Sequence, residues 1–280
     1  MRLGGPVFEK NLTPESWLVA LGRSGYGAAY CPVDEKASDD VVRGYVQAAA
    51  AANIVIAEVG AWSNTVSPDA AAAKKNIEFN QARLALAERV GARCCVNITG
   101  SRGTADWAGP HKDNLTQETF DLIVETVRKI IDFVKPTRTF YTLETMQWMY
   151  PDSADNYLRL IKAIDRPRCA AHFDPTNLVT SPQIYFNTGA MIRDAVAKLG
   201  PYIRSCHAKD VKLANKAHIH MDEIRPGEGN LDYTTYLKEI DKLDPDMPLM
   251  LEHLPNAEQY DLAAKHIRGV AKEAGLSFKG

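Results

Sequence analysis

The chain has 280 residues, of which 45% are hydrophobic and 24% are charged. This is the composition of an ordinary globular protein, and the length suits one large α/β barrel or two small domains. The net charge of −2 argues against a general electrostatic attraction to nucleic acid or to an anionic membrane. No run approaches the roughly 18 apolar residues of a membrane span, and the start of the chain lacks an apolar signal core. We therefore expect a cytoplasmic protein that binds neither nucleic acid nor membrane.

The cysteines indicate the same compartment. They are odd in number, and no two of them have the CxxC spacing of a redox or zinc motif. Most of them stand in apolar, strand-like runs, so we expect reduced and buried thiols that do not bind a metal. The five are Cys31, Cys94, Cys95, Cys169 and Cys206.

Strand-like and helix-like segments alternate along the whole chain. The expected strands are residues 3–8, 28–31, 54–62, 94–99, 139–144, 169–174, 203–207 and 248–252. Helices are expected between them, with Thr13, Ser38 and Asp152-Ser153 as N-terminal caps, a long helix over 69–90 and a closing helix over 256–275. Eight such units predict a single (β/α)₈ TIM barrel over residues 1–280. A doubly wound open sheet is the alternative, but no glycine-rich phosphate loop follows the first strand.

Two connections are longer than a barrel needs. Residues 100–114 follow the fourth strand and contain Trp107 and His111. The other follows the seventh strand and carries Lys209, His220 and Arg225 before the turn at 226–229. Connections of this length are often functional, so we expect both to border the site.

Four of the expected strands end in a side chain that can bind a metal. Strands five, six and eight end in Glu144, Asp174 and Glu252, and strand seven ends in His207. Strand ends of a parallel barrel share one face, so these groups should converge. Buried carboxylates need a cation, and this donor set suits Mn²⁺, Co²⁺ or Mg²⁺ better than structural zinc. The plainer interpretation is that the four residues are loop caps and salt-bridge partners.

The same strand ends carry a resemblance to a known family. The chain resembles the sugar phosphate isomerase/epimerase family of xylose-isomerase-like barrels, which includes D-tagatose 3-epimerase. The segments that carry it are Leu143-Glu144-Thr-Met-Gln-Trp-Met-Tyr-Pro151, His172-Phe-Asp174-Pro-Thr-Asn177, Cys206-His207-Ala-Lys209-Asp210, Arg225-Pro-Gly-Glu-Gly229 and Leu251-Glu252-His253. The resemblance implies one divalent ion per chain, with Mn²⁺ first among the candidates, held by Glu144, Asp174, His207 and Glu252.

The resemblance also implies a reaction. Glu144 and Glu252 would be the catalytic pair: one removes the proton next to a carbonyl and the other returns a proton on the opposite face. A Lewis acid on the carbonyl oxygen and two carboxylates on either side of a planar enediolate are what such an inversion requires. Arg225 matches an arginine near the substrate oxygens. Asn177 stands where the ketose epimerases have a histidine, and Trp148 lies in a loop where they carry a further glutamate, so the free-ketohexose specificity is in question.

Further side chains are candidates for substrate binding, each with a plainer alternative. His172 could instead orient a metal ligand, Lys209 could pair with Asp210, and the tryptophans could only pack a lid. His253 should point away from the site because it follows a ligand directly. The full expected set is Arg225, His172, Lys209, His220, Glu58, Trp107, His111, Trp148 and Asn177.

Four functions remain open from the sequence. The first is a metal-dependent sugar isomerase or epimerase. The second is a lyase that cleaves oxidised (3-keto) C- or O-glycosides by elimination, as the large subunit beside a small β-rich partner. The third, a DNA-repair nuclease, would need more metal ligands and a basic face. The fourth is a non-catalytic binding barrel. The resemblance implies a homo-oligomer.

Overall fold

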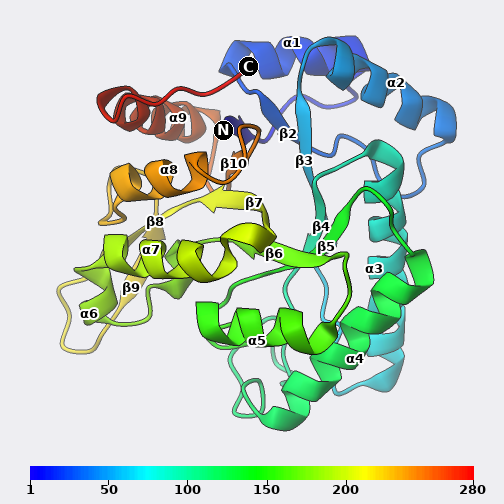
Figure 1. The fold of residues 1–280 in the computed structure, drawn as a ribbon, viewed down its shortest axis with the longest axis vertical. Helices are drawn as coiled ribbons and strands as arrows, with labels where there is room; N and C mark the ends of the chain where they lie inside the picture. Colours follow the sequence, from blue (N-terminus) through cyan, green and yellow to red (C-terminus); the bar gives the residue numbers. More distant parts are fainter.

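Eight parallel strands form the closed barrel that the alternation predicts. The computed structural model describes residues 1–280, and the strands follow one another in the order β1-β10-β7-β6-β5-β4-β3-β2 around the barrel. Figure 1 shows the helices arranged around these strands. The barrel strands are β1 (Arg2–Gly5), β2 (Ala28–Tyr30), β3 (Val55–Gly60), β4 (Cys94–Asn97), β5 (Phe140–Glu144), β6 (Cys169–Phe173), β7 (Ile203–Ala208) and β10 (Pro248–Leu251).

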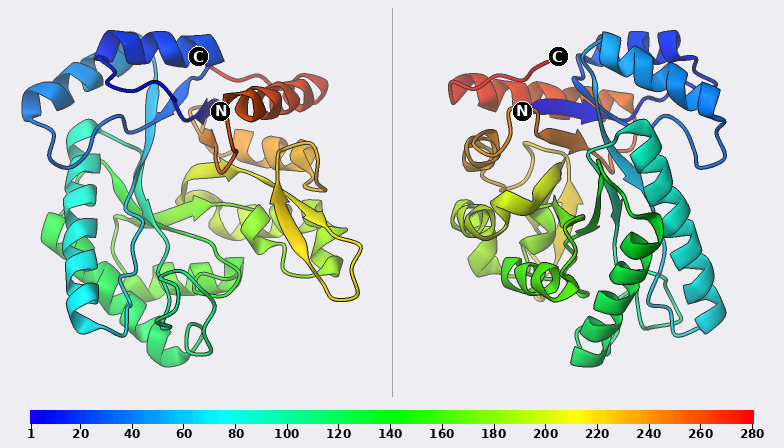
Figure 2. Two further views of the ribbon diagram at one scale, coloured as in Figure 1. Left: turned by 180° about the vertical axis from the view of Figure 1, so that it is seen from behind. Right: turned by 45° about the vertical axis from the view of Figure 1, so that its right-hand side comes forward.

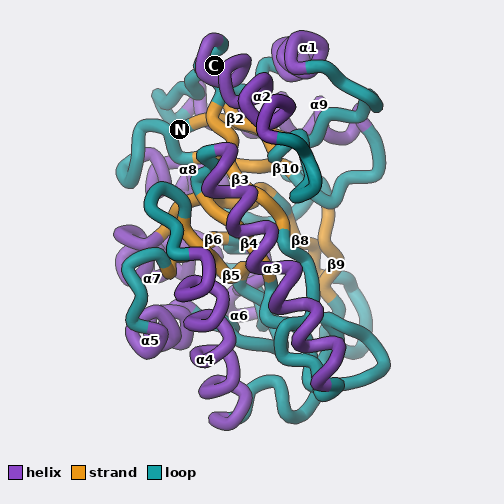
Figure 3. Tube along the Cα trace, turned by 90° about the vertical axis from the view of Figure 1, so that its right-hand side faces the viewer, coloured by secondary structure: helices purple, strands orange, loops and turns teal.

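The helices pack on the outside of the barrel. Figure 3 shows α3 and α4 running side by side along one flank, with the strands behind them. One cluster of buried apolar side chains lies between strands and helices, and it extends from Met1 to Ala271. The helices are α1 (Pro14–Ser24), α2 (Asp39–Ala51), α3 (Ala70–Val90), α4 (Gln117–Val134), α5 (Ala154–Ile164), α6 (Pro182–Tyr185), α7 (Thr188–Leu199), α8 (Tyr233–Asp241) and α9 (Ala257–Glu273), with short 3-10 turns η1 (Thr176–Leu178) and η2 (Gly200–Tyr202).

The predicted helix caps are confirmed by their hydrogen bonds. Thr13 accepts from the backbone N–H of Ser16 at 3.3 Å, and Ser153 accepts from that of Asn156 at 3.2 Å. Each cap satisfies a donor that the first turn of the helix leaves unpaired. At the other end of α3, Gly91 adopts a φ of 70°, the left-handed conformation that ends many helices. None of the helices combines the length and the apolar composition that crossing a membrane requires.

The connection after β7 is not the irregular loop that we expected. It contains an antiparallel hairpin, β8 (Asp210–Leu213) and β9 (Met221–Ile224), which projects from the body of the protein in the left view of Figure 2. The first strand, Asp-Val-Lys-Leu, alternates polar and apolar side chains, which is a strand pattern, whereas the second, Met-Asp-Glu-Ile, does not alternate and gives no such signal.

The carboxylate of Asp210 holds the base of this hairpin. It accepts hydrogen bonds from the backbone N–H groups of Val211, Gly227, Gly229 and Leu231 at 2.8 to 3.1 Å. A Cβ atom at Gly229 would lie 2.2 Å from Asp210 Oδ1, so this close return of the chain needs glycine. The hairpin is therefore fixed at the residue that directly follows Lys209.

Candidate metal and substrate site

The four predicted metal ligands converge at one face of the barrel. Glu144, Asp174, His207 and Glu252 each offer a donor atom, and these atoms all lie within 4.8 Å of one another. The first three are buried and the side chain of Glu252 is 12% exposed. They stand at or just after the ends of β5, β6, β7 and β10, which is the face where barrel enzymes place their sites.

His207 joins this cluster to a second one beneath it. Its Nδ1 atom lies 3.2 Å from Glu144 Oε1 and 2.7 Å from Glu252 Oε1. Its Nε2 atom lies 3.0 Å from Glu58 Oε1, while the other oxygen of Glu58 lies 2.8 Å from His172 Nε2. The Glu58 carboxylate thus bridges two imidazole rings. Burial raises the pKa of Glu58, but the charges of His207 and His172 outweigh it and lower the pKa to about 2.

Glu58 and His172 do not lie where we expected substrate contacts. Both are buried and neither lines the cavity described below. Because β3 carries Glu58 into the barrel interior, its oxygens face the two histidines instead of the solvent. The structure supports the alternative role for His172, orientation of groups at the site.

Lys209 lies among the carboxylates. Its Nζ atom is 2.9 Å from Asp174 Oδ2 and 3.2 Å from Glu144 Oε1, and it also contacts Glu252 Oε1. The pairing with Asp210 that we considered does not occur, because Asp210 binds backbone N–H groups. Burial raises the pKa of Asp174, against the opposing effect of Lys209. The pKa of Glu144 is lowered despite its burial, chiefly by Lys209 and His207.

The donor set fits a divalent cation. Three carboxylates and one imidazole converge here, and this oxygen-rich, negatively charged set favours a divalent ion. Asp174 Oδ1 accepts the N–H of Thr176 at 2.9 Å, while Asp174 Oδ2 and Glu252 Oε1 accept no aligned hydrogen bond although cationic nitrogens lie near them. Buried carboxylate oxygens that lack an aligned hydrogen-bond donor are suited to metal coordination. Glu144, Asp174, His207 and Glu252 would hold the ion.

A cavity of about 460 Å³ opens above these donors. Three tryptophans from the loops after β3, β4 and β5 form part of its wall, and their exposed fractions of 37 to 46% leave ring surface free. Trp148 is held by a hydrogen bond from Nε1 to the backbone oxygen of Ala108 at 2.8 Å. The lining residues are Trp62, Ile98, Trp107, Glu144, Met146, Gln147, Trp148, Asn177, Lys209, Met221, Glu223, Glu252 and His253.

Asn177 reaches both the cavity and a candidate ligand. Its Nδ2 atom donates to Glu144 Oε1 at 3.1 Å, and its Oδ1 atom accepts from Gln147 at 3.3 Å. The structure thus places four predicted substrate contacts on the cavity wall. These are Lys209, Trp107, Trp148 and Asn177.

Three other predicted contacts lie away from the cavity. The return of the hairpin brings Arg225 beside Glu228, with which it pairs. His220 stands near the hairpin tip, exposed and 3.0 Å from Asp222. His111 turns toward Asp113 within the loop after β4. None of the three lines this cavity, so their role as substrate contacts stays a prediction.

The hairpin contributes two cavity residues that we did not predict from the sequence. Met221 and Glu223 line the cavity from β9, and their spacing of two residues on one strand is the signal that could have revealed them. The expectation that His253 points away is wrong. Its φ of 58° turns the chain back, and its Nδ1 atom lies 3.1 Å from Glu223 Oε1.

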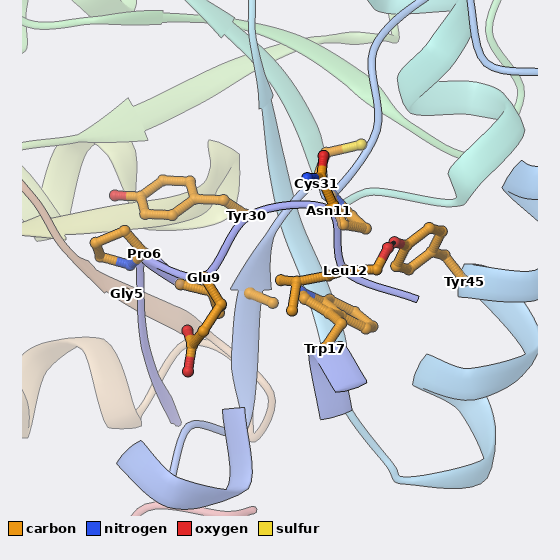
Figure 4. Close-up of a pocket in the computed structure, with 12 residues that line it drawn as sticks. Gly5, Pro6, Glu9, Asn11, Leu12, Trp17, Tyr30, Cys31 and Tyr45 are labelled. Carbon is orange, nitrogen blue, oxygen red and sulfur yellow. Dashed lines mark hydrogen bonds between the residues drawn. The ribbon is translucent and has the colours of Figure 1, made fainter. Parts of the chain in front are cut away.

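A second cavity of about 430 Å³ lies beside β1 and β2. Figure 4 shows Glu9, Trp17, Tyr30 and Tyr45 around it. Glu9 is the one charged side chain that lines it, and no metal-binding group of side chains lies there. The cavity above the four donors is therefore the candidate site.

Comparison with known proteins agrees with this fold. A family model described as a xylose isomerase-like TIM barrel matches residues 21–270. The chain belongs to this family. The sequence has no match among curated proteins. Solved structures that share this fold include D-psicose 3-epimerase at 14% identity and L-ribulose 3-epimerase at 16% identity.

Solved structures share the fold at low sequence identity. D-psicose 3-epimerase from Clostridium cellulolyticum H10, solved with D-tagatose, has a TM-score of 0.69 at 14% identity, over 99% of this chain and 100% of that one. A xylose isomerase-like barrel protein from Mycobacterium smegmatis, in complex with magnesium, has a TM-score of 0.67 at 17% identity, over 95% and 90%. The probable 3-DHS dehydratase AsbF from Bacillus anthracis has a TM-score of 0.70 at 16% identity, over 97% and 99%.

Proposed function

We propose that this protein is a divalent-metal-dependent sugar isomerase or epimerase that moves a proton next to a carbonyl group through an enediolate. The observation that carries the proposal is the convergence of Glu144, Asp174, His207 and Glu252 beside the cavity, which Glu144 and Glu252 line. A metal-binding group of this kind beneath an opening of sugar size is what such a reaction needs. Family membership supports the same class.

Glu144 and Glu252 are the proposed acid–base pair. Both line the cavity, so each can reach a bound substrate. One carboxylate takes the proton from the carbon next to the carbonyl, and the other returns a proton to the opposite face of the planar intermediate. The hydrogen bond from Asn177 fixes the direction of Glu144.

The ion would supply Lewis-acid polarisation of the substrate carbonyl, which lowers the pKa of the neighbouring C–H group. We propose Mn²⁺, with Co²⁺ or Mg²⁺ as substitutes, because the oxygen-rich donor set favours such ions. One structural relative was solved with magnesium. The five thiols are unpaired, in agreement with a cytoplasmic location. A homo-oligomer remains our proposal for the assembly.

A lyase is the second candidate, and the tryptophan-lined wall favours it. A 3-keto-glycoside with an aromatic aglycone would stack on Trp62, Trp107 or Trp148. The same carboxylate would remove the proton next to the keto group, and the intermediate would expel the leaving group from the adjacent carbon. The structural relative from Bacillus anthracis is named a probable dehydratase, which is also a lyase. A small β-rich subunit would complete such an enzyme.

Deuterium exchange followed by NMR tests the proposal. Metal-stripped protein reloaded with Mn²⁺ in D₂O is given ketohexoses, ketopentoses and aryl 3-keto-glycosides. We expect metal-dependent deuterium incorporation at the carbon next to the carbonyl, and its loss in Glu144→Gln and Glu252→Gln. Formation of the epimer or the isomer supports the first candidate, and release of the aglycone supports the second. No exchange with any substrate, despite one bound ion per chain, would contradict both.

A further inference from the structure

The ammonium of Lys209 contacts three of the side chains that would hold the proposed metal. Its side chain is only 3% exposed, and it contacts Asp174, Glu144 and Glu252. These are three of the four proposed ligands. A buried ammonium at this distance partly neutralises the carboxylates, so the protein carries a cation of its own at the site.

The base of the Lys209 side chain is rigidly held. Its backbone oxygen accepts a hydrogen bond from the Tyr233 hydroxyl at 2.7 Å, and the next residue, Asp210, binds four backbone N–H groups. Only the flexible methylene chain is therefore free to redirect the ammonium. A fourth carboxylate lies within its reach, because Glu223 Oε2 on β9 is 4.0 Å from Nζ.

We propose that Lys209 is an internal counter-cation that competes with the divalent ion for the carboxylates and transfers to Glu223 when the ion binds. The inference rests on the proposed metal-dependent function. An ammonium and a divalent ion repel each other at contact distance, so binding of the ion should drive the ammonium away from the oxygens that they share. Glu223 is 38% exposed and lines the cavity. The displaced ammonium therefore reaches the wall where a substrate oxygen can accept a hydrogen bond from it.

Calorimetric titration of metal-stripped protein with Mn²⁺ tests the inference without any substrate. The variants are Lys209→Met and, as a matched control, Lys212→Met, which removes an exposed lysine three residues along the chain. We expect Lys209→Met to bind Mn²⁺ about tenfold more tightly or better, because a like charge leaves the site. The control should bind as the wild type does.

Thermal unfolding provides a second measurement. Without metal, Lys209→Met should unfold at a lower temperature than the wild type, because three buried carboxylates lose their cation. With saturating Mn²⁺ the difference should shrink. A lysine with a merely structural role would lower both transition temperatures equally, and that result would overturn the inference.

The outcomes separate this inference from the proposed function. If the wild type binds one ion and Lys209→Met binds it equally or less well, the inference fails and the proposed function stands. If only Lys209→Met binds an ion, Lys209 excludes the ion from the natural chain, so the transfer to Glu223 and the proposed metal dependence both fail. If neither binds, both fail.

A second variant keeps the inference testable if Lys209→Met does not fold. Glu223→Gln removes the alternative partner of the ammonium from a partly exposed position on β9. We expect this variant to bind Mn²⁺ several-fold more weakly than the wild type, because the displaced lysine has no carboxylate to receive it. Unchanged affinity would overturn the inference.

Discussion

Glu58 Oε1 lies 3.0 Å from Nε2 of His207, while Nδ1 of the same ring faces Glu144 and Glu252. One nitrogen of the imidazole is thus held from beneath, and the other is directed into the candidate metal site. A carboxylate in this position fixes both the ring orientation and the nitrogen that carries the proton, and it makes the histidine a better ligand. Glu58 therefore acts through His207, as a positioning residue.

Removal of this carboxylate should weaken metal binding. We expect Glu58→Gln to bind Mn²⁺ about 10 to 100-fold more weakly, because the amide can no longer hold both His207 and His172 as an acceptor. Calorimetric titration measures the change. Glu78→Gln, an exposed glutamate on α3, is the control and should leave the affinity unchanged. Wild-type affinity in Glu58→Gln would show that the contact only packs the barrel interior.

The tryptophan wall predicts a dependence on substrate size. Trp148→Ala should raise KM for an aryl 3-keto-glycoside about tenfold, because a stacking surface is lost. KM for a small ketose should change little. Trp148→Phe keeps an aromatic ring but loses the hydrogen bond to Ala108. Its KM for the aryl 3-keto-glycoside should therefore lie between those of the wild type and Trp148→Ala. Equal losses for both substrates would mean that Trp148 shapes the loop and does not bind the aglycone.

Loss of the Tyr157 hydroxyl should destabilise the barrel beneath the site. Its hydroxyl lies 3.1 Å from the backbone nitrogen of Leu143 and 3.0 Å from that of His172, so it joins α5 to β5 and β6. Tyr157→Phe should lower the free energy of unfolding by about 1 to 3 kcal/mol, because buried N–H groups lose their acceptor. Urea denaturation measures this loss. A change below about 0.5 kcal/mol, as for an ordinary surface substitution, would show that these donors find another partner.

Glu88 predicts a dependence of stability on pH. Burial raises its pKa, but hydrogen bonds from the Thr137 hydroxyl and from the backbone of residues 137–139 outweigh burial and lower the pKa to about 2. A lowered pKa stabilises the fold above the ordinary glutamate value, and this contribution is lost as the pH falls toward 2. Glu88→Gln should therefore be less stable than the wild type at pH 7, and the difference should vanish near pH 2. Acid unfolding curves of both proteins measure it. If the difference in stability between Glu88→Gln and the wild type stayed constant from pH 7 to pH 2, the lowered pKa of Glu88 would be contradicted.

The barrel could be predicted because its signals are local. Strand runs, caps such as Thr13, and the position of Glu144 and His207 at strand ends are all visible within a few residues of sequence. Convergence of the ligands followed from the rule that parallel strand ends share one face. This rule needs no knowledge of side-chain packing, so it located the candidate site.

The interactions around the ligands could not be predicted in the same way. That Glu58 bridges two histidines depends on which way β3 turns its side chains within the closed barrel. The position of Lys209 among the carboxylates depends on the path of its methylene chain. Analogy with a motif predicts Arg225 at the site, whereas the hairpin return directs it to Glu228. Such contacts join side chains whose directions are set by the folded backbone, and no local pattern records them.

The hydrogen bonds of Asp210 have a consequence for how this protein can diversify. One carboxylate joins the start of the hairpin to the backbone of residues 227–231. The two ends of the hairpin are therefore held together at its base, independently of the residues at its tip. Residues 214–220, at the tip, can change in sequence or length without disturbing the strands. Met221 and Glu223 would carry such changes to the cavity wall. We therefore expect changes at the hairpin tip to reshape the cavity wall while the barrel strands keep their arrangement.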